Sequence, residues 1–248
     1  MMGKSSLLGF LVLTCVMIGC TPTTETGVRR VKIGQSDEAN LGREVLAAPV
    51  TSREAAPLDA PTRILVDSYG STIKRNAERY GFDWRLVVAI MKVESGFSLD
   101  AESEKGASGL MQIMPATSEE VGRKLEIEDM AHPMNNIHGG IYYLGRLYKL
   151  FDGAEQTDRI RLTLAAYNAG AGRIYDAQDL AAYLRENPRS WQAVRDALPL
   201  LSKRYYTLHK NIWAQEKPRS GWFGGSKETV AYVDKVMRYY EGYRVTLN

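Results

Sequence analysis

The sequence predicts a mostly α-helical domain over residues 61–248. Three observations favour this fold class. Capping residues, prolines and glycines mark the ends of successive segments of helical length. Within those segments, apolar residues recur at intervals of three and four, as they do on the buried face of a helix. No segment alternates between apolar and polar residues over the length that a strand requires.

Composition and charge restrict the class of protein further. The chain has 248 residues, of which 44% are hydrophobic and 25% charged, so we expect one domain with a sizeable core and a tail. The formal net charge is only +3, and no run of lysines or arginines has the pattern of a phosphate-binding surface. We therefore expect no nucleic-acid partner.

The first twenty residues are predicted to be a lipoprotein signal peptide. Lys4 precedes an apolar run, residues 7–18, which is too short to span a bilayer comfortably and ends in small residues. A short membrane anchor is the alternative. Residues 17–20 resemble the lipobox of bacterial lipoproteins, and this resemblance makes Cys20 the expected lipidation site. By the same resemblance, Thr21 after the cysteine implies the outer membrane.

Residues 21–60 are expected to form a flexible tether between the signal peptide, residues 1–20, and the helical domain. They are rich in Thr, Ala, Gly, Pro and charged residues and show no sustained periodicity. A flexible chain of about 40 residues has a root-mean-square reach of about 35 Å. Acyl chains on this tether would hold the domain near the membrane but outside it.

The domain begins with two predicted helices. Asp59 or Ala60 caps the first, which Pro61 opens and a glycine at position 81 closes. Asp83 caps the second, the run WRLVVAIMKVE, which ends in Glu94 just before another glycine.

Later helices follow at short intervals. Thr117 and Glu120 form a predicted capping box for the run SEEVGRKL. Asn135 is expected to start a helix that a glycine at position 153 stops, and Asp158 is expected to start the run RIRLTLAAYNAG. Four further helical patterns cover DLAAYLREN, SWQAVRDAL, LLSKRYYTLHKNIW and KETVAYVDKVMRYY.

Cysteine and histidine usage argues against a metal centre. Both cysteines, Cys15 and Cys20, lie in the predicted signal peptide, so the domain has no disulfide, thiol nucleophile or cysteine-based metal site. His132 and His138 are six residues apart, a poor fit to one helix face, and His209 is far along the chain.

Glu94 is the candidate catalytic acid. The end of a helix carries partial negative charge, which disfavours an anion there, and apolar neighbours such as Val93 and Phe97 would add desolvation. Both effects raise the pKa of a glutamate, and a glutamic acid that keeps its proton near neutral pH suits general acid catalysis. A frayed, solvated helix end is the alternative.

Residues beside Glu94 suit a saccharide ligand. The loop after the helix contains several glycines, which allow close approach of a ligand. Ser103 offers a small hydroxyl and Gln112 an amide that can bind sugar hydroxyls. Tyr167 and Asn168 pair an aromatic face with an amide at a helix end. The alternative is a core tyrosine followed by a capping asparagine.

Five motifs in order resemble the catalytic domain of bacterial soluble-lytic-transglycosylase-type enzymes, which have a goose-type-lysozyme-like fold. They are ESG at position 94, GASGLMQIMP, NIHGGIYYL, AAYNAGAGR and ETVAYVDKV. The segment from YDAQDL to LSKRYY further resembles the catalytic module of the membrane-bound lytic transglycosylases of type F. This resemblance implies that Glu94 is the catalytic acid/base. It also implies saccharide-binding roles for Ser103, Gln112, Met114, Tyr167, Asn168, Glu228 and Tyr232.

The resemblance implies cleavage of the β-1,4 bond between N-acetylmuramic acid and N-acetylglucosamine in peptidoglycan, with 1,6-anhydro products. Glu94 would act as acid and then as base, and a hydroxyl of the substrate would be the nucleophile, so a second carboxylate is not needed. Glu228 is the rival for that second carboxylate and is assigned to orientation or electrostatic support. No metal and no organic cofactor is expected. A lysozyme-type or chitinase-type hydrolase and a non-catalytic peptidoglycan-binding lipoprotein are the alternatives.

The expected partners are peptidoglycan glycan strands and, through the lipid anchor, a membrane; protein partners stay open. The expected location is the periplasmic face of the outer membrane. The segment GWFGG, residues 221–225, lies in a stretch that fits the resemblance poorly. It is either an exposed loop that reaches substrate or membrane, or a loop above a packed Trp222.

Overall fold

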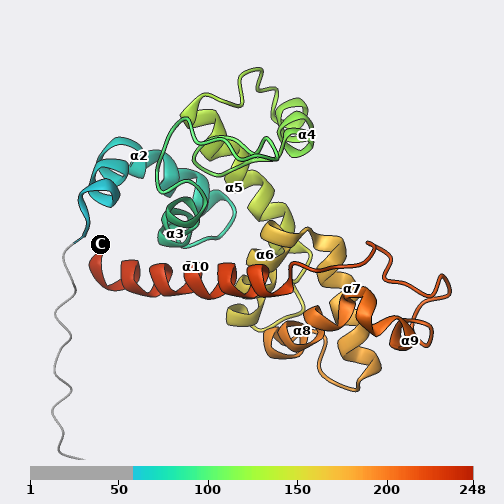
Figure 1. The fold of residues 1–248 in the computed structure, drawn as a ribbon. Coiled ribbons are helices and arrows are strands. Elements are labelled where there is room, and N and C mark those ends of the chain that lie inside the picture. The colour runs from blue at the N-terminus through green and yellow to red at the C-terminus, as the bar shows by residue number, and fades with distance from the viewer. Residues whose placement is uncertain (1–57, 248) are drawn as a thin grey trace, which may run out of the picture. The chain divides into compact units, whose positions relative to one another are not determined.

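The structure, a computed structural model, describes residues 58–247. The predicted signal peptide and almost all of the predicted tether lie outside the described residues. Within 58–247 the chain is helical, and its only β-type pairings are isolated bridges from Ser108 to Glu102 and to Ile113. The predicted mostly helical fold is confirmed, and Figure 1 shows its helices.

The first two helices begin where the sequence predicts. Helix α2 spans Ala60–Arg79, and the side chain of Asp59 accepts a hydrogen bond from the backbone N–H of Thr62. Helix α3 spans Trp84–Glu94, and Asp83 caps it in the same way. These aspartates satisfy N–H groups that a helix start leaves without partners.

The next three helices begin earlier than predicted. Helices α4, Pro115–Leu125, and α5, Pro133–Lys149, each open on a proline. Proline suits the first turn of a helix because it has no N–H to leave unpaired. The predicted starts at Thr117 and Asn135 are therefore wrong, and so is the capping box, since Met114 occupies the N-cap and makes no side-chain cap.

Helix α6 spans Gln156–Ala169 and also precedes its predicted start, Asp158, which lies in its first turn. Gly170 ends α6 with φ of 89°, a value that L side chains rarely adopt, and the chain turns there into α7, Ala171–Tyr183.

The segment after α8, Trp191–Ala197, breaks into short pieces where a single helix was expected. These pieces are η1, Leu198–Leu201, η2, Lys203–Tyr205, and α9, Tyr206–His209. Ser202 is extended and its hydroxyl caps the next turn at Arg204, so the helix cannot run through it.

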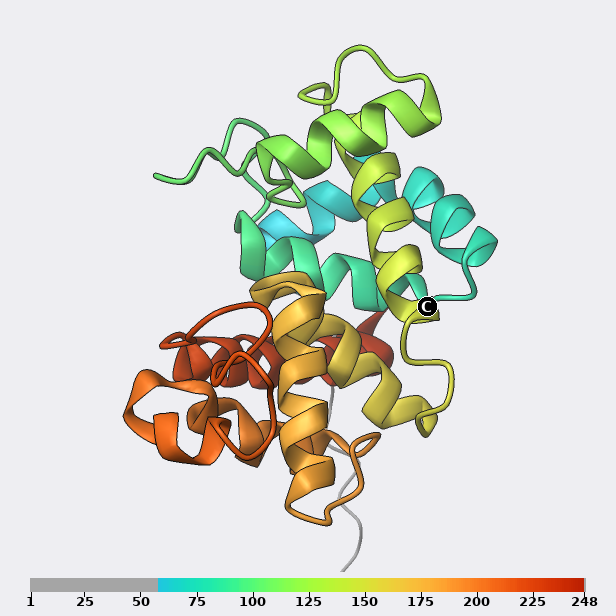
Figure 2. The same cartoon turned by 90° about the vertical axis from the view of Figure 1, so that its right-hand side faces the viewer.

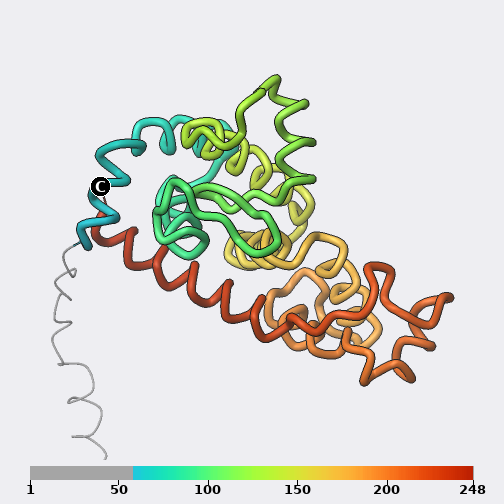
Figure 3. The backbone as a smooth tube through the Cα atoms, turned by 45° about the horizontal axis from the view of Figure 1, so that its top comes forward, coloured from blue at the N-terminus to red at the C-terminus, as the bar shows by residue number. Residues whose placement is uncertain are grey.

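Helix α10, Ser226–Thr246, contacts α3 and α6 along its length. Figures 1 and 3 show it as a long helix whose C-terminal end lies near α2. Tyr243 hydrogen-bonds Thr62 of α2 at that end, and Tyr240 donates to Asp83, the cap of α3. Figure 2 shows α4 at one end of this domain and α8 and α9 at the other. The helices enclose a core whose largest fully buried side chains include Ile73, Ile90, Met91, Leu110, Met111, Ile137 and Leu164.

Candidate active site

Glu94 is the last residue of α3, and its side chain is partly buried. Burial raises the pKa of its carboxyl from the ordinary 4.5 to about 7, while a hydrogen bond from Tyr232 acts in the opposite direction. The predicted upward shift of the pKa is confirmed. At neutral pH a substantial fraction of Glu94 therefore keeps its proton and is able to donate it.

Tyr232 comes from the first half of α10 and places its hydroxyl 2.6 Å from Oε1 of Glu94. Burial raises the pKa of Tyr232 well above its usual value, and the negative charge of Glu94 adds to that shift. The phenol therefore stays protonated and acts as a donor. Since Oε1 accepts this hydrogen bond, the acidic proton of Glu94 belongs on Oε2.

The end of α6 supplies the aromatic residue and the amide. The hydroxyl of Tyr167 donates to the carbonyl of Met111 at 2.8 Å, and its ring lies 5.6 Å from that of Tyr143. Burial raises the pKa of Tyr167 well above its usual value, with the charge of Glu94 as the next cause. Asn168 is exposed, and its Oδ1 accepts from Thr229 of α10 at 2.9 Å. This hydrogen bond to Oδ1 fixes the orientation of the side-chain amide and therefore of its NH₂ group.

The loop between α3 and α4 is hydrogen-bonded to α5. Asn136 is buried, and its Oδ1 accepts from the N–H of Met111 at 2.9 Å while its Nδ2 donates to the carbonyl of Ser108 at 3.1 Å. Gly109 has φ of 75°, and a Cβ there would lie 2.6 Å from the Asn136 amide. Only glycine fits this position, because any other residue would strain the backbone at this φ and would clash with the Asn136 amide.

Two of the predicted binding residues also hold the loop together. Ser103 Oγ accepts from the N–H of Ala107 at 3.0 Å, which leaves the hydroxyl hydrogen to donate elsewhere. Gln112 has φ of 46° and its Nε2 donates to the carbonyls of Ala101, at 2.9 Å, and Gly109, at 3.0 Å. Its amide hydrogens are therefore engaged within the loop, and its Oε1 is the atom left for a ligand.

The other two predicted binding residues are exposed. Met114 is 43% exposed and directly precedes α4. Glu228 lies in the first turn of α10, four residues before Tyr232 and hence on the same face of the helix. Burial alone raises the Glu94 pKa, and the Tyr232 hydroxyl opposes it, so no second carboxylate contributes to the shift.

The sequence interpretation missed several residues of this site. Asn136 carried a signal, an amide on the otherwise apolar face of the helix NIHGGIYYL. Thr229 and Tyr143 carried none, because their partners lie on other helices, far along the chain. Within residues 58–247, no cluster of three or more His, Cys, Asp or Glu side chains has the arrangement of a metal site. None of the helices in that range combines the length and apolar character needed to cross a membrane.

Part of the chain is similar to known proteins. Residues 71–188 match the transglycosylase SLT domain. The membrane-bound lytic murein transglycosylases F of Desulfosudis oleivorans and Shewanella pealeana are 35% and 37% identical to this chain over 170 and 174 residues. These alignments cover 68% and 70% of this chain but 35% and 33% of the relatives, so it spans about a third of their length.

A solved structure is similar as well. The 70 kDa soluble lytic transglycosylase of Escherichia coli superposes with a TM-score of 0.50 at 26% identity, covering 71% of this chain and 24% of that one. The similarity agrees with the lysozyme-like fold expected from the sequence motifs.

Proposed function

We propose that the protein is a murein lytic transglycosylase, because residues 71–188 match the transglycosylase SLT domain. It cleaves the β-1,4 bond between N-acetylmuramic acid and N-acetylglucosamine and leaves 1,6-anhydro ends. The observation that carries this proposal is the single carboxyl of Glu94, whose pKa is about 7 and whose Oε1 accepts from Tyr232. A group with this pKa near neutral pH is able to serve both as acid and as base.

In the first step, Glu94 donates the proton on Oε2 to the glycosidic oxygen. The bond from C1 of the muramyl sugar to that oxygen breaks, and the N-acetylglucosamine side leaves as an alcohol. Positive charge develops at C1, and the new Glu94 carboxylate faces it. The hydrogen bond from Tyr232 strengthens as Glu94 becomes an anion, so it favours this state over the starting one.

In the second step, the C6 hydroxyl of the same muramyl sugar attacks C1 and transfers its proton to Glu94. A bond from O6 to C1 forms, the 1,6-anhydro ring closes, and Glu94 is again protonated. No water is consumed. The enzyme therefore needs no second carboxylate of the kind that retaining and inverting glycosidases place about 5–10 Å from the acid.

The predicted binding residues are assigned supporting roles in these steps. The remaining hydroxyl hydrogen of Ser103 is available to the muramyl N-acetyl group, and the Asn168 NH₂ group, held by Thr229, is available to a sugar oxygen. Glu228 and the exposed Met114 are assigned to contacts with the glycan strand. Gln112 contributes chiefly by fixing the loop.

Mass spectrometry of digested sacculi tests the reaction. We expect muropeptides with 1,6-anhydro ends from the purified protein and none from the Glu94→Gln variant. Products heavier by one water would instead support a lysozyme-type hydrolase. Absence of any soluble product from the wild-type protein would support a non-catalytic peptidoglycan-binding role.

We also propose that the protein is a lipoprotein attached through Cys20 to the periplasmic face of the outer membrane. The lipobox-like residues 17–20 support this location, as do relatives named as membrane-bound enzymes. Membrane fractionation is the test. We expect the wild-type protein in the membrane fraction and Cys20→Ala in the soluble fraction or unprocessed; unchanged fractionation of the variant would contradict lipidation.

A further inference from the structure

Trp222 differs from the other three tryptophans of the chain, all of which lie within residues 58–247. It is 38% exposed, whereas Trp191 and Trp213 are each 4% exposed and Trp84 is half-buried. One face of its indole stacks on the imidazole of His209, with ring centroids 5.1 Å apart and planes 30° from parallel. Since one face is covered, the exposed area belongs to the opposite face and the edges.

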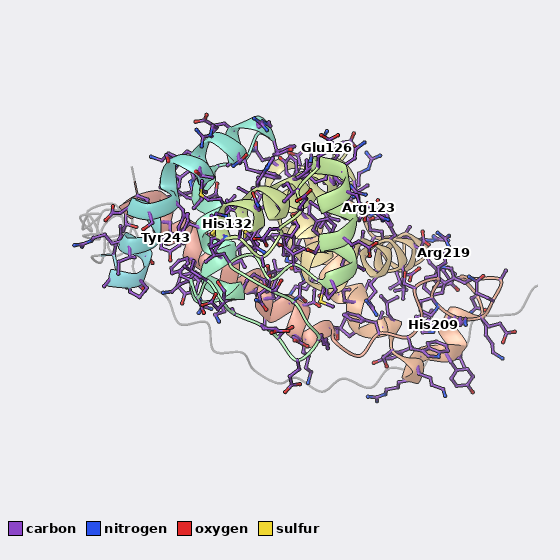
Figure 4. The ribbon with its side chains drawn as sticks, turned by 90° about the horizontal axis from the view of Figure 1, so that it is seen from above. Arg123, Glu126, His132, His209, Arg219 and Tyr243 are labelled. Atoms are coloured by element: carbon purple, nitrogen blue, oxygen red, sulfur yellow. The ribbon has the colours of Figure 1, made fainter. Side chains whose placement is uncertain are left out.

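The ring beneath Trp222 is firmly supported. His209 is 0% exposed and its Nε2 lies 2.7 Å from the carbonyl of Leu200. The ring of Trp213 lies 5.5 Å from His209, and its Nε1 donates to Asp179 of α7 at 3.3 Å. Figure 4 shows His209 and Arg219 at one end of the domain and Tyr243 toward the other. The indole therefore stacks on an imidazole that contacts Trp213, and Trp213 is hydrogen-bonded to α7.

The loop that carries Trp222 is fixed on both sides of it. Before it, the buried carboxylate of Asp176 accepts from the N–H groups of Arg219, at 3.1 Å, and Ser220, at 2.8 Å. After it, the N–H of Phe223 donates to the carbonyl of Leu201 at 3.1 Å. A loop held in this way loses little conformational entropy on binding, so Trp222 is preorganised for a ligand.

This loop leads directly into the candidate active site. Six residues after Trp222 the chain reaches Glu228, and the next residue, Thr229, holds Asn168. Seven residues span at most about 24 Å even when fully extended. Trp222 and the binding groups of α10 thus lie within the length that a glycan strand bound at Glu94 would cover.

We propose that Trp222 is a sugar-stacking platform, outside the Glu94 centre, for strands of β-1,4-linked N-acetylated amino sugars. This inference rests on the proposed function. The apolar C–H face of a pyranose packs on an indole, while its hydroxyl and acetamido groups need polar partners at the ring edge. Exposed Arg219 and half-buried Asp179, 3.1 Å apart, adjoin Trp213 through the Asp179 carboxylate, and they supply both donors and acceptors.

Binding of chitohexaose to the Glu94→Gln variant tests the platform without consuming the ligand. In this background Trp222→Ala should weaken binding about fivefold to tenfold, the loss expected for one aromatic stacking contact. Tyr183→Ala is the matched control, because Tyr183 is 47% exposed on α7 but belongs to no such stack; it should bind as the parent does. Equal binding by the Trp222→Ala protein, or equal weakening in both variants, would overturn the proposal.

A second measurement covers the case in which Trp222→Ala disturbs the fold. Trp222→Phe keeps a ring on His209, and its thermal unfolding should match that of the parent. Saturating chitohexaose should change the tryptophan emission of the parent and leave that of Trp222→Phe nearly unchanged, and an undiminished change in this variant would exclude Trp222 as the contact. Failure of the proposed function would show separately, as the absence of 1,6-anhydro products from sacculi.

Discussion

At the scale of single residues, Glu94 stabilises the fold less than a neutral side chain would. Its pKa of about 7 in the folded chain, against the ordinary 4.5, means that the folded state binds its proton more tightly than the unfolded state does. The contribution of Glu94 to stability is thus fully present below pH 4.5 and is lost as the pH rises through 7. The proton proposed for catalysis and the loss of stability have the same origin, the burial of the carboxyl.

Glu94→Gln should therefore raise the free energy of unfolding at pH 8 by on the order of 3 kcal/mol, and by nearly nothing at pH 4. Urea unfolding at the two pH values measures this difference. Glu228→Gln, the same substitution at an exposed position, is the control. A gain for Glu94→Gln that is the same at both pH values would contradict burial of the charge as its cause.

Tyr232→Phe should move the alkaline limb of the pH–activity profile to higher pH. The lost hydrogen bond lowers the pKa of Glu94 in the wild-type chain, so its removal lets that pKa rise and keeps the acid protonated longer. Turnover should fall, because the anion formed in the first step loses its donor. Rates of sacculus digestion, measured at intervals of about one pH unit or less from about pH 5 to 9, report both effects.

Tyr240→Phe is the matched control for this variant. It removes another tyrosine-to-carboxylate hydrogen bond of the same helix, from Tyr240 to Asp83 at 3.1 Å. We expect a loss of about 1 kcal/mol in stability and no movement of the pH profile. The same movement in both variants would assign the effect to α10 as a whole.

At the scale of elements, the sequence predicted which segments are helical better than where each helix begins. The starts at α2 and α3 were predictable because aspartate caps act within three residues of their partners. The capping box of α4 failed because the helix begins at Pro115, two residues before Thr117, and Glu120 pairs with Arg146 of α5. A partner on another helix leaves no trace in the local pattern.

Gly140→Ala tests the packing of α5 against the loop. A Cβ at this position would lie 2.7 Å from Cβ of Met111, whose carbonyl accepts from Tyr167. We expect a loss of about 1–3 kcal/mol in stability, as for other overpacked sites, together with lower activity. In the matched variant Gly242→Ala of α10, the added methyl meets nothing within 4 Å. It should gain about 0.5–1 kcal/mol from helix propensity, and chemical denaturation compares the two.

Asp176→Ala should loosen the loop before α10. The variant loses two hydrogen bonds from backbone N–H groups to a buried carboxylate, worth about 2–4 kcal/mol together. Limited proteolysis should then cut between residues 217 and 225 faster than in the wild-type protein. Asp67→Ala, at an exposed position of α2, should leave the digestion pattern unchanged; equal cutting in both variants would remove Asp176 from this role.

At the scale of the whole domain, the site depends on three helices that the sequence alone does not bring together. Glu94 and Tyr232 are 138 positions apart, and Asn168 and Thr229 are 61 apart. The candidate residues were predictable because their motifs resemble a family, but their partners were not, because residue type and spacing say nothing about contacts across such separations. Roles that only the resemblance implies stay predictions until a bound saccharide is seen.

Helix α10 should also make the domain unfold as one unit. It contacts α3 and α6, and its C-terminal end is bonded to α2 through Tyr243. Far-ultraviolet circular dichroism and tryptophan fluorescence should therefore give the same midpoint in urea. Two separate midpoints would show that the half containing Trp213 and Trp222 unfolds independently of the rest.

The long separation between Glu94 and Tyr232 has a consequence for the timing of activity. Helix α10 is synthesised after every other helix that the structure describes, and it packs on α3, so the burial that raises the Glu94 pKa is incomplete until α10 has packed. Before then Glu94 is an ordinary solvated carboxylate, almost fully ionised at neutral pH and without a proton to give. If Glu94 is the proposed acid, a chain in which α10 is unfolded is thus inactive toward glycans, and packing of this helix is the step that activates it.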